Sequence, residues 1–370
     1  MKRLISAAMA ALIMGSALTF AGCGEKKFEI GGARYEYNVT HIEITGKHLA
    51  MASSLEELAQ CDQLTSLTLD HCDLSDISYI AKVPSLKRLS LVGNDISDIS
   101  ELSALKNLEV LVISENNVSD ISSVASMTKL TYLDVGKNPV ADLMPVMNLT
   151  EMEKLYIDET AITDISPVVR LTKLEELYAS SNPLTGFDAL SELKHLHVLD
   201  LYNTTIKDLS PIKDLSGLRE LYIGDNPGIK DFAPVTALSK LEIFGAENCS
   251  ITDAAFLSGM KELKELYLTN DEISDITPLC SVKTLKKLNI EGNYAVTSEI
   301  VETFRAEVPH CEIKHSELKS AADIKTKKSD TKSENTGYID EFPDGDEEEE
   351  DEDDEEEDNE TDSDSETEAE

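Results

Sequence analysis

The sequence predicts an α/β repeat fold: a solenoid with a parallel β-sheet on its concave face and turns or short 3₁₀ segments on its convex face. Three observations carry this prediction. A Leu-x-x-Leu-x-Leu motif returns at a spacing of 22 residues, a polar residue follows it at a fixed position, and five prolines share one later position. A fixed period of this size indicates stacked repeats, because one unit buries its apolar face only against its neighbours.

The strand of each unit is the motif itself, since alternating apolar and polar residues are typical of a strand with one buried face. Every step between motifs is 22 residues except the 23-residue step from Leu218 to Leu241, where Gly228 is the expected insertion. The motifs begin at Leu64, Leu86, Leu108, Leu130, Met152, Leu174, Leu196, Leu218, Leu241, Leu263 and Leu285.

Position nine of each unit, counted from the first Leu, is usually asparagine. Its side chain donates and accepts hydrogen bonds, so it can satisfy backbone groups that a buried turn leaves open. Thr160, Thr204, Cys72 and Cys249 replace it in part, whereas Asp271 cannot donate when ionised, so we expect a local irregularity there. The asparagines are Asn94, Asn116, Asn138, Asn182, Asn226 and Asn293.

The second half of each unit is too short for a long helix, and its prolines favour a tight turn or a 3₁₀ segment. These prolines are Pro145, Pro167, Pro211, Pro234 and Pro278. An aspartate also recurs here, and we interpret it as a turn residue that caps the adjacent backbone rather than as a ladder of metal ligands. The aspartates are Asp76, Asp98, Asp120, Asp142, Asp164, Asp208, Asp231, Asp253 and Asp275.

Together these motifs resemble the leucine-rich-repeat family, in particular its 22-residue class found in bacterial internalins. The resemblance covers roughly residues 39–314. It implies a right-handed horseshoe that binds its ligands on the concave sheet.

Both ends of the array carry degenerate units. Residues 39–63 are expected to form an N-terminal cap repeat, with a strand at 39–44, and residues 64–295 the repeats. Leu55, Leu58 and Cys61 match the second half of a repeat.

The C-terminal cap is expected at 296–317, with a helix that Ser298 could cap and a last strand at 311–313. The apolar face of this helix would consist of Ile300, Val301, Phe304 and Val308.

The N-terminus has the features of an export signal: Lys2 and Arg3 precede an apolar run that ends in small residues. Residues 1–22 are therefore interpreted as a signal peptide, followed by a tether at 23–38. The Ala-Gly-Cys ending resembles the lipobox of bacterial lipoproteins, which implies lipidation of Cys23 and a membrane anchor at the cell surface. Phe20 stands where that family usually has Leu, and an ordinary signal peptide remains the alternative.

Charge and composition restrict the function. The net charge is −39, and residues 341–370 carry 21 acidic and no basic side chains, which leaves −18 on the rest. Such a body repels phosphates and argues against a nucleic-acid partner. We expect residues 318–370 to form a disordered acidic tail.

Catalytic and metal-binding motifs are not found: the sequence has no GxSxG, HExxH, Walker or EF-hand pattern. His195 and His197 are expected to be exposed or to pack, not to bind metal. The cysteines other than Cys23 lack metal or redox spacing and are interpreted mostly as buried apolar residues. We therefore expect no enzymatic activity, no cofactor and no metal site.

The polar positions of the strands are the candidate binding residues, because they point outward from the concave sheet. Tyrosines recur there among acidic residues, which favours a protein partner with a basic patch. Alternatives are glycan binding, a structural envelope spacer without a specific ligand, and an intracellular phosphatase-regulator role that the export signal disfavours. The candidate residues are Tyr132, Tyr156, Tyr178, Tyr202, Tyr222, Tyr267, Asp134, Asp158, Glu176, Asp200, Glu220 and Glu265.

Overall fold

The computed structural model describes residues 27–47, 49, 55–320 and 322. The chain divides into two compact units, residues 1–324 and 325–370, and the described residues belong to the first. The predicted signal peptide, Cys23 and the acidic run at 341–370 lie outside the described residues.

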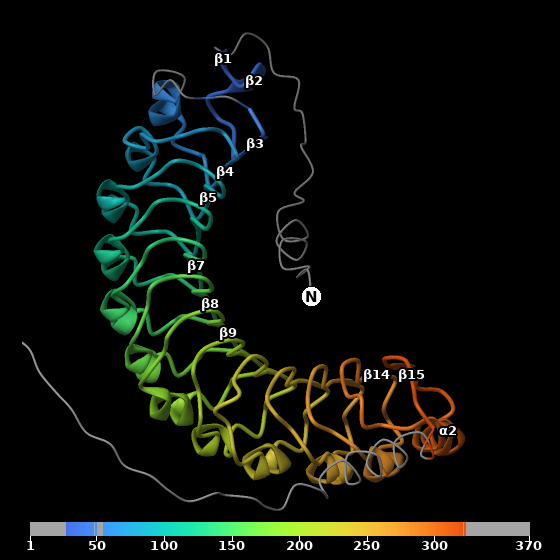
Figure 1. Ribbon diagram of the computed structural model, residues 1–370. Coiled ribbons are helices and arrows are strands. Elements are labelled where there is room, and N and C mark those ends of the chain that lie inside the picture. Colours follow the sequence, from blue (N-terminus) through green and yellow to red (C-terminus); the bar gives the residue numbers. More distant parts are fainter. Residues whose placement is uncertain (1–26, 48, 50–54, 321, 323–370) are drawn as a thin grey trace, which may run out of the picture. The chain divides into compact units, whose positions relative to one another are not determined.

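The repeats form one parallel sheet in which the strands β3 to β15 follow each other in sequence order. Adjacent strands pair in constant register, so that Leu155 lies opposite Leu177 and Tyr156 opposite Tyr178. In Figure 1 the strands line the inner side of this unit and the 3₁₀ segments its outer side. The strands are β3 His41–Thr45, β4 Ser66–Asp70, β5 Arg88–Ser90, β6 Val110–Val112, β7 Tyr132–Asp134, β8 Lys154–Tyr156, β9 Glu176–Tyr178, β10 Val198–Asp200, β11 Glu220–Tyr222, β12 Ile243–Gly245, β13 Glu265–Tyr267, β14 Lys287–Asn289 and β15 Glu312–Lys314.

The outer segments are short 3₁₀ helices, as the repeated prolines predicted. All five prolines lie in the first turn of such a segment. The recurring aspartates cap them: in each of the nine, Oδ1 accepts a hydrogen bond from the backbone N–H two residues later. The segments are η2 Glu56–Gln60, η3 Ile80–Lys82, η4 Ser100–Ala104, η5 Ser122–Ser126, η6 Met144–Asn148, η7 Ser166–Arg170, η8 Phe187–Glu192, η9 Ser210–Ile212, η10 Ala233–Ala237, η11 Ala255–Gly259 and η12 Thr277–Ser281.

The core is a continuous aliphatic layer between sheet and outer segments, with the asparagines of position nine along its edge. Asn94 shows their role. Its Nδ2 donates to the carbonyls of Leu69 (2.8 Å) and Leu91 (2.9 Å), and its Oδ1 accepts from the N–H of Cys72 (2.9 Å) and Leu74 (3.1 Å). Each asparagine thus satisfies backbone groups of the buried turn, as the sequence predicted, and also joins its own repeat to the preceding one.

The predicted tether at 23–38 is wrong for most of its length. Lys27–Ile30 (β1) and Ala33–Glu36 (β2) form an antiparallel hairpin, and Phe28 and Ile30 are buried against the first repeat. The turn is Gly31-Gly32, both at positive φ, which is the conformation that tight hairpins require. Alternating Phe28 and Ile30 before two glycines was the signal for this element, and it supplies the end cap.

The C-terminal cap agrees with the prediction in its main elements. The helix α2 Ser298–Glu307 buries Val301 and Phe304, although Thr297, not Ser298, precedes it as N-cap and makes no capping side-chain bond. The ordered chain extends beyond the predicted boundary, because Leu318 packs against the core and Lys319 pairs with Thr297. The expectation of disorder is therefore wrong for these residues.

The five described cysteines are free thiols, and all but the half-buried Cys280 are buried, as expected. Burial raises the pKa of Cys61 and Cys311 to about 11, so these thiols stay protonated. Within the described ranges, no helix is long and apolar enough to cross a membrane.

Candidate functional site

The candidate site is the concave face, which we define as the side chains at positions three, five and seven of each strand motif. Because side chains alternate along a strand, these positions face away from the core. Parallel pairing places equal positions in rows, with adjacent strands about 4.8 Å apart. Position five is tyrosine in β8, β9, β11 and β13.

Three tyrosines form a continuous stack on this face. The ring centroids of Tyr132 and Tyr156 are 5.1 Å apart, and those of Tyr156 and Tyr178 are 4.6 Å apart with nearly parallel planes. The central ring is consequently 9% exposed. Tyr156 therefore supports its two neighbours, which are only half-buried and lie at the ends of the stack.

The tyrosine hydroxyls are joined to glutamates, which the sequence analysis treated as a separate set. Tyr222 donates to Glu220 (2.9 Å) and Tyr267 donates to Glu265 (2.6 Å) within the same strand. Tyr156 donates across the sheet to Glu176 (2.7 Å). The tripeptide Glu-Leu-Tyr, which occurs in β9, β11 and β13, was the available signal for this network. These bonds fix the ring positions and leave ring edges at the surface.

Asp200 and Tyr202 are two further candidates on this face. Asp200 lies between Tyr178 and Tyr222 in the register and is 3% exposed, so the structure does not offer it to a partner. Tyr202 lies at position seven, where its hydroxyl donates to Asp225.

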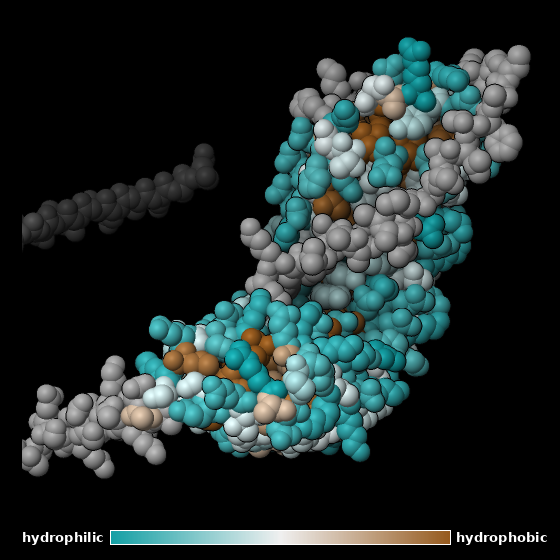
Figure 2. All heavy atoms as spheres, turned by 90° about the vertical axis from the view of Figure 1, so that its right-hand side faces the viewer, coloured by the Kyte–Doolittle hydropathy of each residue, from teal (hydrophilic) through white to brown (hydrophobic). Residues whose placement is uncertain are grey.

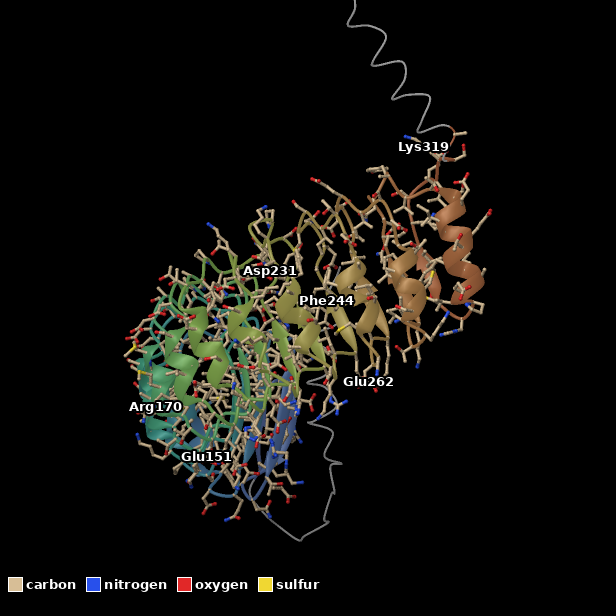
Figure 3. The ribbon with its side chains drawn as sticks, turned by 90° about the horizontal axis from the view of Figure 1, so that it is seen from below. Glu151, Arg170, Asp231, Phe244, Glu262 and Lys319 are labelled. Atoms are coloured by element: carbon tan, nitrogen blue, oxygen red, sulfur yellow. The ribbon has the colours of Figure 1, made fainter. Side chains whose placement is uncertain are left out.

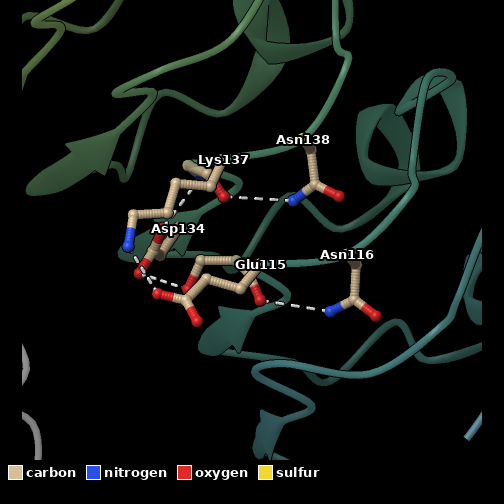
Figure 4. A network of polar contacts seen from close by, with 7 residues as sticks. Glu115, Asn116, Asp134, Lys137 and Asn138 are labelled. Carbon is tan, nitrogen blue, oxygen red and sulfur yellow. Dashed lines mark hydrogen bonds and ion pairs between the residues drawn. The ribbon is translucent and has the colours of Figure 1, made fainter. Parts of the chain in front are cut away.

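Asp134 lies in a network of polar contacts that also includes Glu115 and Lys137 (Figure 4). Its carboxylate accepts hydrogen bonds from the Ser114 hydroxyl (3.0 Å) and the Gly136 N–H (3.0 Å). Burial, reinforced by the negative charge of Asp158, nevertheless raises the pKa of Asp134 to about 6. Position seven of the next motif supplies that charge: Asp158 accepts from the Ser180 hydroxyl (2.6 Å).

The two lysines on this face pair with acids: Lys154 with Glu176 and Lys287 with Glu265. Beside the face, at position eight, Lys137 pairs with Glu115 (2.6 Å). The other acids therefore determine its net negative charge, which fits a basic partner. In Figure 2, which views the molecule from the right-hand side of Figure 1, hydrophilic residues dominate, with smaller hydrophobic patches between them.

The repeat with 23 residues has a different core and a different concave face, which its sequence did not lead us to predict. After the extra residue at 228, the core changes from leucine to phenylalanine: Phe244 replaces the second Leu of β12 and packs edge-on to Phe256, which stacks on Phe232 at 5.4 Å. Figure 3 shows Phe244 between Asp231 and Glu262, which lie toward opposite margins of the ribbon in that view. On the opposite side of this strand, position five is Gly245 instead of a large side chain.

Among the residues that the structure describes, no group of three or more His, Cys, Asp or Glu side chains could hold a metal ion. His195 and His197 are exposed, as predicted, and His195 Nδ1 contacts the Thr172 carbonyl at 2.9 Å.

Comparison with known sequences identifies the repeat type. The family model for leucine-rich repeats in two copies matches residues 84–125, 106–146 and 194–240. The fold is a leucine-rich-repeat solenoid. No curated protein matches this chain in sequence.

Solved leucine-rich-repeat structures match most of this chain. The internalin InlF of Listeria monocytogenes is 26% identical with a TM-score of 0.64, over 78% of this chain and 91% of its own. The functional domain of the Listeria internalin InlJ, described as including a cysteine ladder, is 23% identical with a TM-score of 0.55, over 71% of this chain and 61% of its own. A leucine-rich-repeat protein of Leptospira interrogans is 19% identical with a TM-score of 0.51, over 75% and 90%. The chain is thus internalin-like in its repeats and structure.

Proposed function

We propose that this chain is an exported, lipid-anchored recognition protein that binds another protein, one with a basic patch, through its concave face. The observation that carries the proposal is the row of tyrosine rings on that face, whose hydroxyls bond to carboxylates, beside lysines that are already paired with acids. Fixed aromatic rings provide contact area without loss of side-chain entropy on binding. The 26% identity to an internalin over most of both chains supports a binding role over a catalytic one.

Glycan binding is the second candidate, and the geometry disfavours it in part. Sugars stack on exposed faces of aromatic rings, whereas Tyr132, Tyr156 and Tyr178 bury ring faces against each other. A glycan array with no hits, beside a captured protein, would remove this alternative.

The binding face is tested by photo-cross-linking on intact cells. A benzoylphenylalanine replacing Tyr222 should give a discrete protein adduct, because that half-buried ring lies in the proposed interface. The same residue replacing Met144, which is 56% exposed on an outer segment, should not give this adduct. Identical adducts from both positions, or adducts from Met144 alone, would refute the assignment of the concave face.

The membrane anchor is tested by Cys23→Ser. We expect this variant to lose incorporation of labelled fatty acid and to leave the detergent phase in phase partitioning, because several acyl chains on one cysteine contribute about 0.8 kcal/mol per buried CH₂. Cys280→Ser is the matched control, since that thiol is free and half-buried within the repeats. Undiminished labelling of Cys23→Ser would disprove the lipoprotein assignment.

A further inference from the structure

The row of position-five side chains is interrupted at β12. Gly245 lies directly opposite Tyr222 of β11 on one side and Tyr267 of β13 on the other. Two tyrosines whose strands are about 9.6 Å apart thus flank a position without a side chain. We name this gap, with its walls Tyr222 and Tyr267, its end residue Glu247 and its floor Gly224 and Gly245, the Gly245 notch.

Glycine is required here for space, not for backbone conformation, because neither Gly224 nor Gly245 has a positive φ. A Cβ at residue 245 would lie 3.0 Å from Cδ1 of Tyr222 and 3.2 Å from Oε2 of Glu247. A Cβ at residue 224 would lie 2.8 Å from Cδ2 of Tyr202 and 2.9 Å from the same Oε2. The Glu247 carboxylate therefore rests on two glycines, beside the rings of Tyr202 and Tyr222.

Glu247 has no cationic neighbour among the described residues, for none of the ion pairs between them includes it. Nearby Glu242, in contrast, pairs with both Arg219 (2.7 Å) and Lys264 (2.5 Å). Asp225 is also satisfied, since it accepts from the Tyr202 hydroxyl and from Asn248 Nδ2 (2.5 Å).

The surroundings of Glu247 penalise its charge. Burial, followed by the negative charges of Asp225 and Asp271, raises its pKa. A half-buried carboxylate in this state gains free energy when a cation enters beside it.

The two rings lie on the strands at either side of Gly245. Their hydroxyls donate to Glu220 and Glu265, at the opposite side of the row from Glu247. The pKa of Tyr267 is raised by burial, by the bond to Glu265 and also by the charge of Glu247, which places this carboxylate within electrostatic reach of the Tyr267 ring. A cation near such rings gains about 0.5–2 kcal/mol from the aromatic face in addition to the carboxylate.

We propose that the Gly245 notch binds the cationic end of one lysine or arginine side chain of the protein partner. The inference rests on the proposed function, because the notch would be the central contact of the proposed interface. The cation would lie above two glycines, between two tyrosine rings and next to one carboxylate.

The full chain, labelled with ¹³C on its tyrosine rings, is titrated with a tetralysine peptide and followed by NMR. The ring signals of Tyr222 and Tyr267, assigned with Tyr→Phe variants, should shift saturably. Glu247→Gln should raise the apparent Kd from these signals at least fivefold, and Gly245→Ala, which keeps every charge but fills the notch, should do the same.

Glu291→Gln is the matched control, because Glu291 occupies position seven of another repeat and its replacement removes the same charge. It should change the apparent Kd less than twofold. Tyr338 reports separately on binding to the acidic run at 341–370 and should respond equally in all variants. Circular dichroism should be unchanged throughout.

Three results would each contradict binding in the notch. They are an equal loss of peptide affinity in Glu247→Gln and Glu291→Gln, an unaltered affinity in Gly245→Ala, and chemical-shift changes confined to Tyr338. None of these results would alter the cross-linking result from residue 222, so failure of the notch and failure of the concave-face assignment are distinguishable.

Discussion

Replacing Asn182 with alanine is expected to lower the free energy of unfolding by about 3–5 kcal/mol, since each buried group left without a partner costs about 1–3 kcal/mol. Asn182 is 2% exposed. Its Nδ2 donates to the carbonyls of Ile157 (2.7 Å) and Ala179 (3.1 Å), and its Oδ1 accepts from both the N–H (3.1 Å) and the hydroxyl (2.7 Å) of Thr160. Alanine would leave the Thr160 N–H and the Ala179 carbonyl without this partner, whereas the Thr160 hydroxyl would keep its bond to the Ile157 carbonyl (3.1 Å).

Urea unfolding followed by circular dichroism measures this loss, and hydrogen exchange at the Thr160 N–H locates it. Asn107→Ala is the control, because Asn107 is exposed and bonds only to the Pro84 carbonyl and to the exposed Lys129 ammonium among the described residues; it should stay within about 0.5 kcal/mol of the wild type. A loss below about 1 kcal/mol in Asn182→Ala would show that the asparagine row contributes little to stability.

Replacing Asp271 with asparagine is expected to stabilise the protein. Asp271 stands at position nine, where Oδ1 accepts from the N–H of Cys249 (2.9 Å) and Ile251 (3.1 Å), as an asparagine would. Oδ2 is buried and has no hydrogen-bond partner. It occupies the place of the amide nitrogen that, in the other repeats, donates to carbonyls of two adjacent strands.

The pH dependence follows from the same geometry. Burial raises the pKa of Asp271 to about 6, against an ordinary value of 3.8, although three backbone N–H groups oppose the shift. The folded state therefore favours the neutral acid, and this contribution is fully present below pH 3.8 and is lost as the pH rises through 6. A shift of this size corresponds to about 2–3 kcal/mol at pH 7.5.

Asp271→Asn should accordingly raise the free energy of unfolding at pH 7.5 by about 2 kcal/mol and have less effect at pH 4. The wild type should gain stability from pH 7.5 to pH 5, and the variant should keep only the part of this gain that the other carboxyls with a raised pKa provide, namely Asp70, Asp134 and Glu247. The reverse change, Asn94→Asp, should introduce the same dependence in another repeat. Equal effects of Asp271→Asn at both pH values would disprove this explanation.

Most of the fold was predictable because its information is periodic. The spacing of the leucines, position-nine asparagines and prolines specified strands, ladder and outer segments by residue number. At Asp271 the repeat stays in register, and only the missing donor that the sequence indicated is seen, as the unpartnered Oδ2. The hairpin at 27–36 was missed because it occurs once, outside the period, in a segment assigned to a tether. Its Phe28 and Ile30 gain their burial only from the end of the stack.

From the sequence, the candidate site could be predicted only as one face of the sheet, without knowing which of its side chains are accessible. The sequence identified the tyrosines and acids that point outward, but burial depends on neighbours in the next strands. Tyr156 and Asp200 are buried by residues of the adjacent strands, 22 positions away in the sequence. The sequence pattern of a single strand does not show such contacts. The importance of Gly245 was missed for a related reason: the absence of a side chain matters only where two adjacent strands carry tyrosine.

The constant register also determines how this sequence can change over time. Six of the ion pairs join residues separated by 22 positions, among them Lys87 to Glu109 and Lys264 to Glu242. Duplication or loss of a whole 22-residue segment preserves such neighbours and lengthens or shortens the array by one layer of about 4.8 Å. A length change of one residue is tolerated in the loop after β11, where the interval from Arg219 to Glu242 becomes 23, but within a strand it would turn every following side chain to the other face.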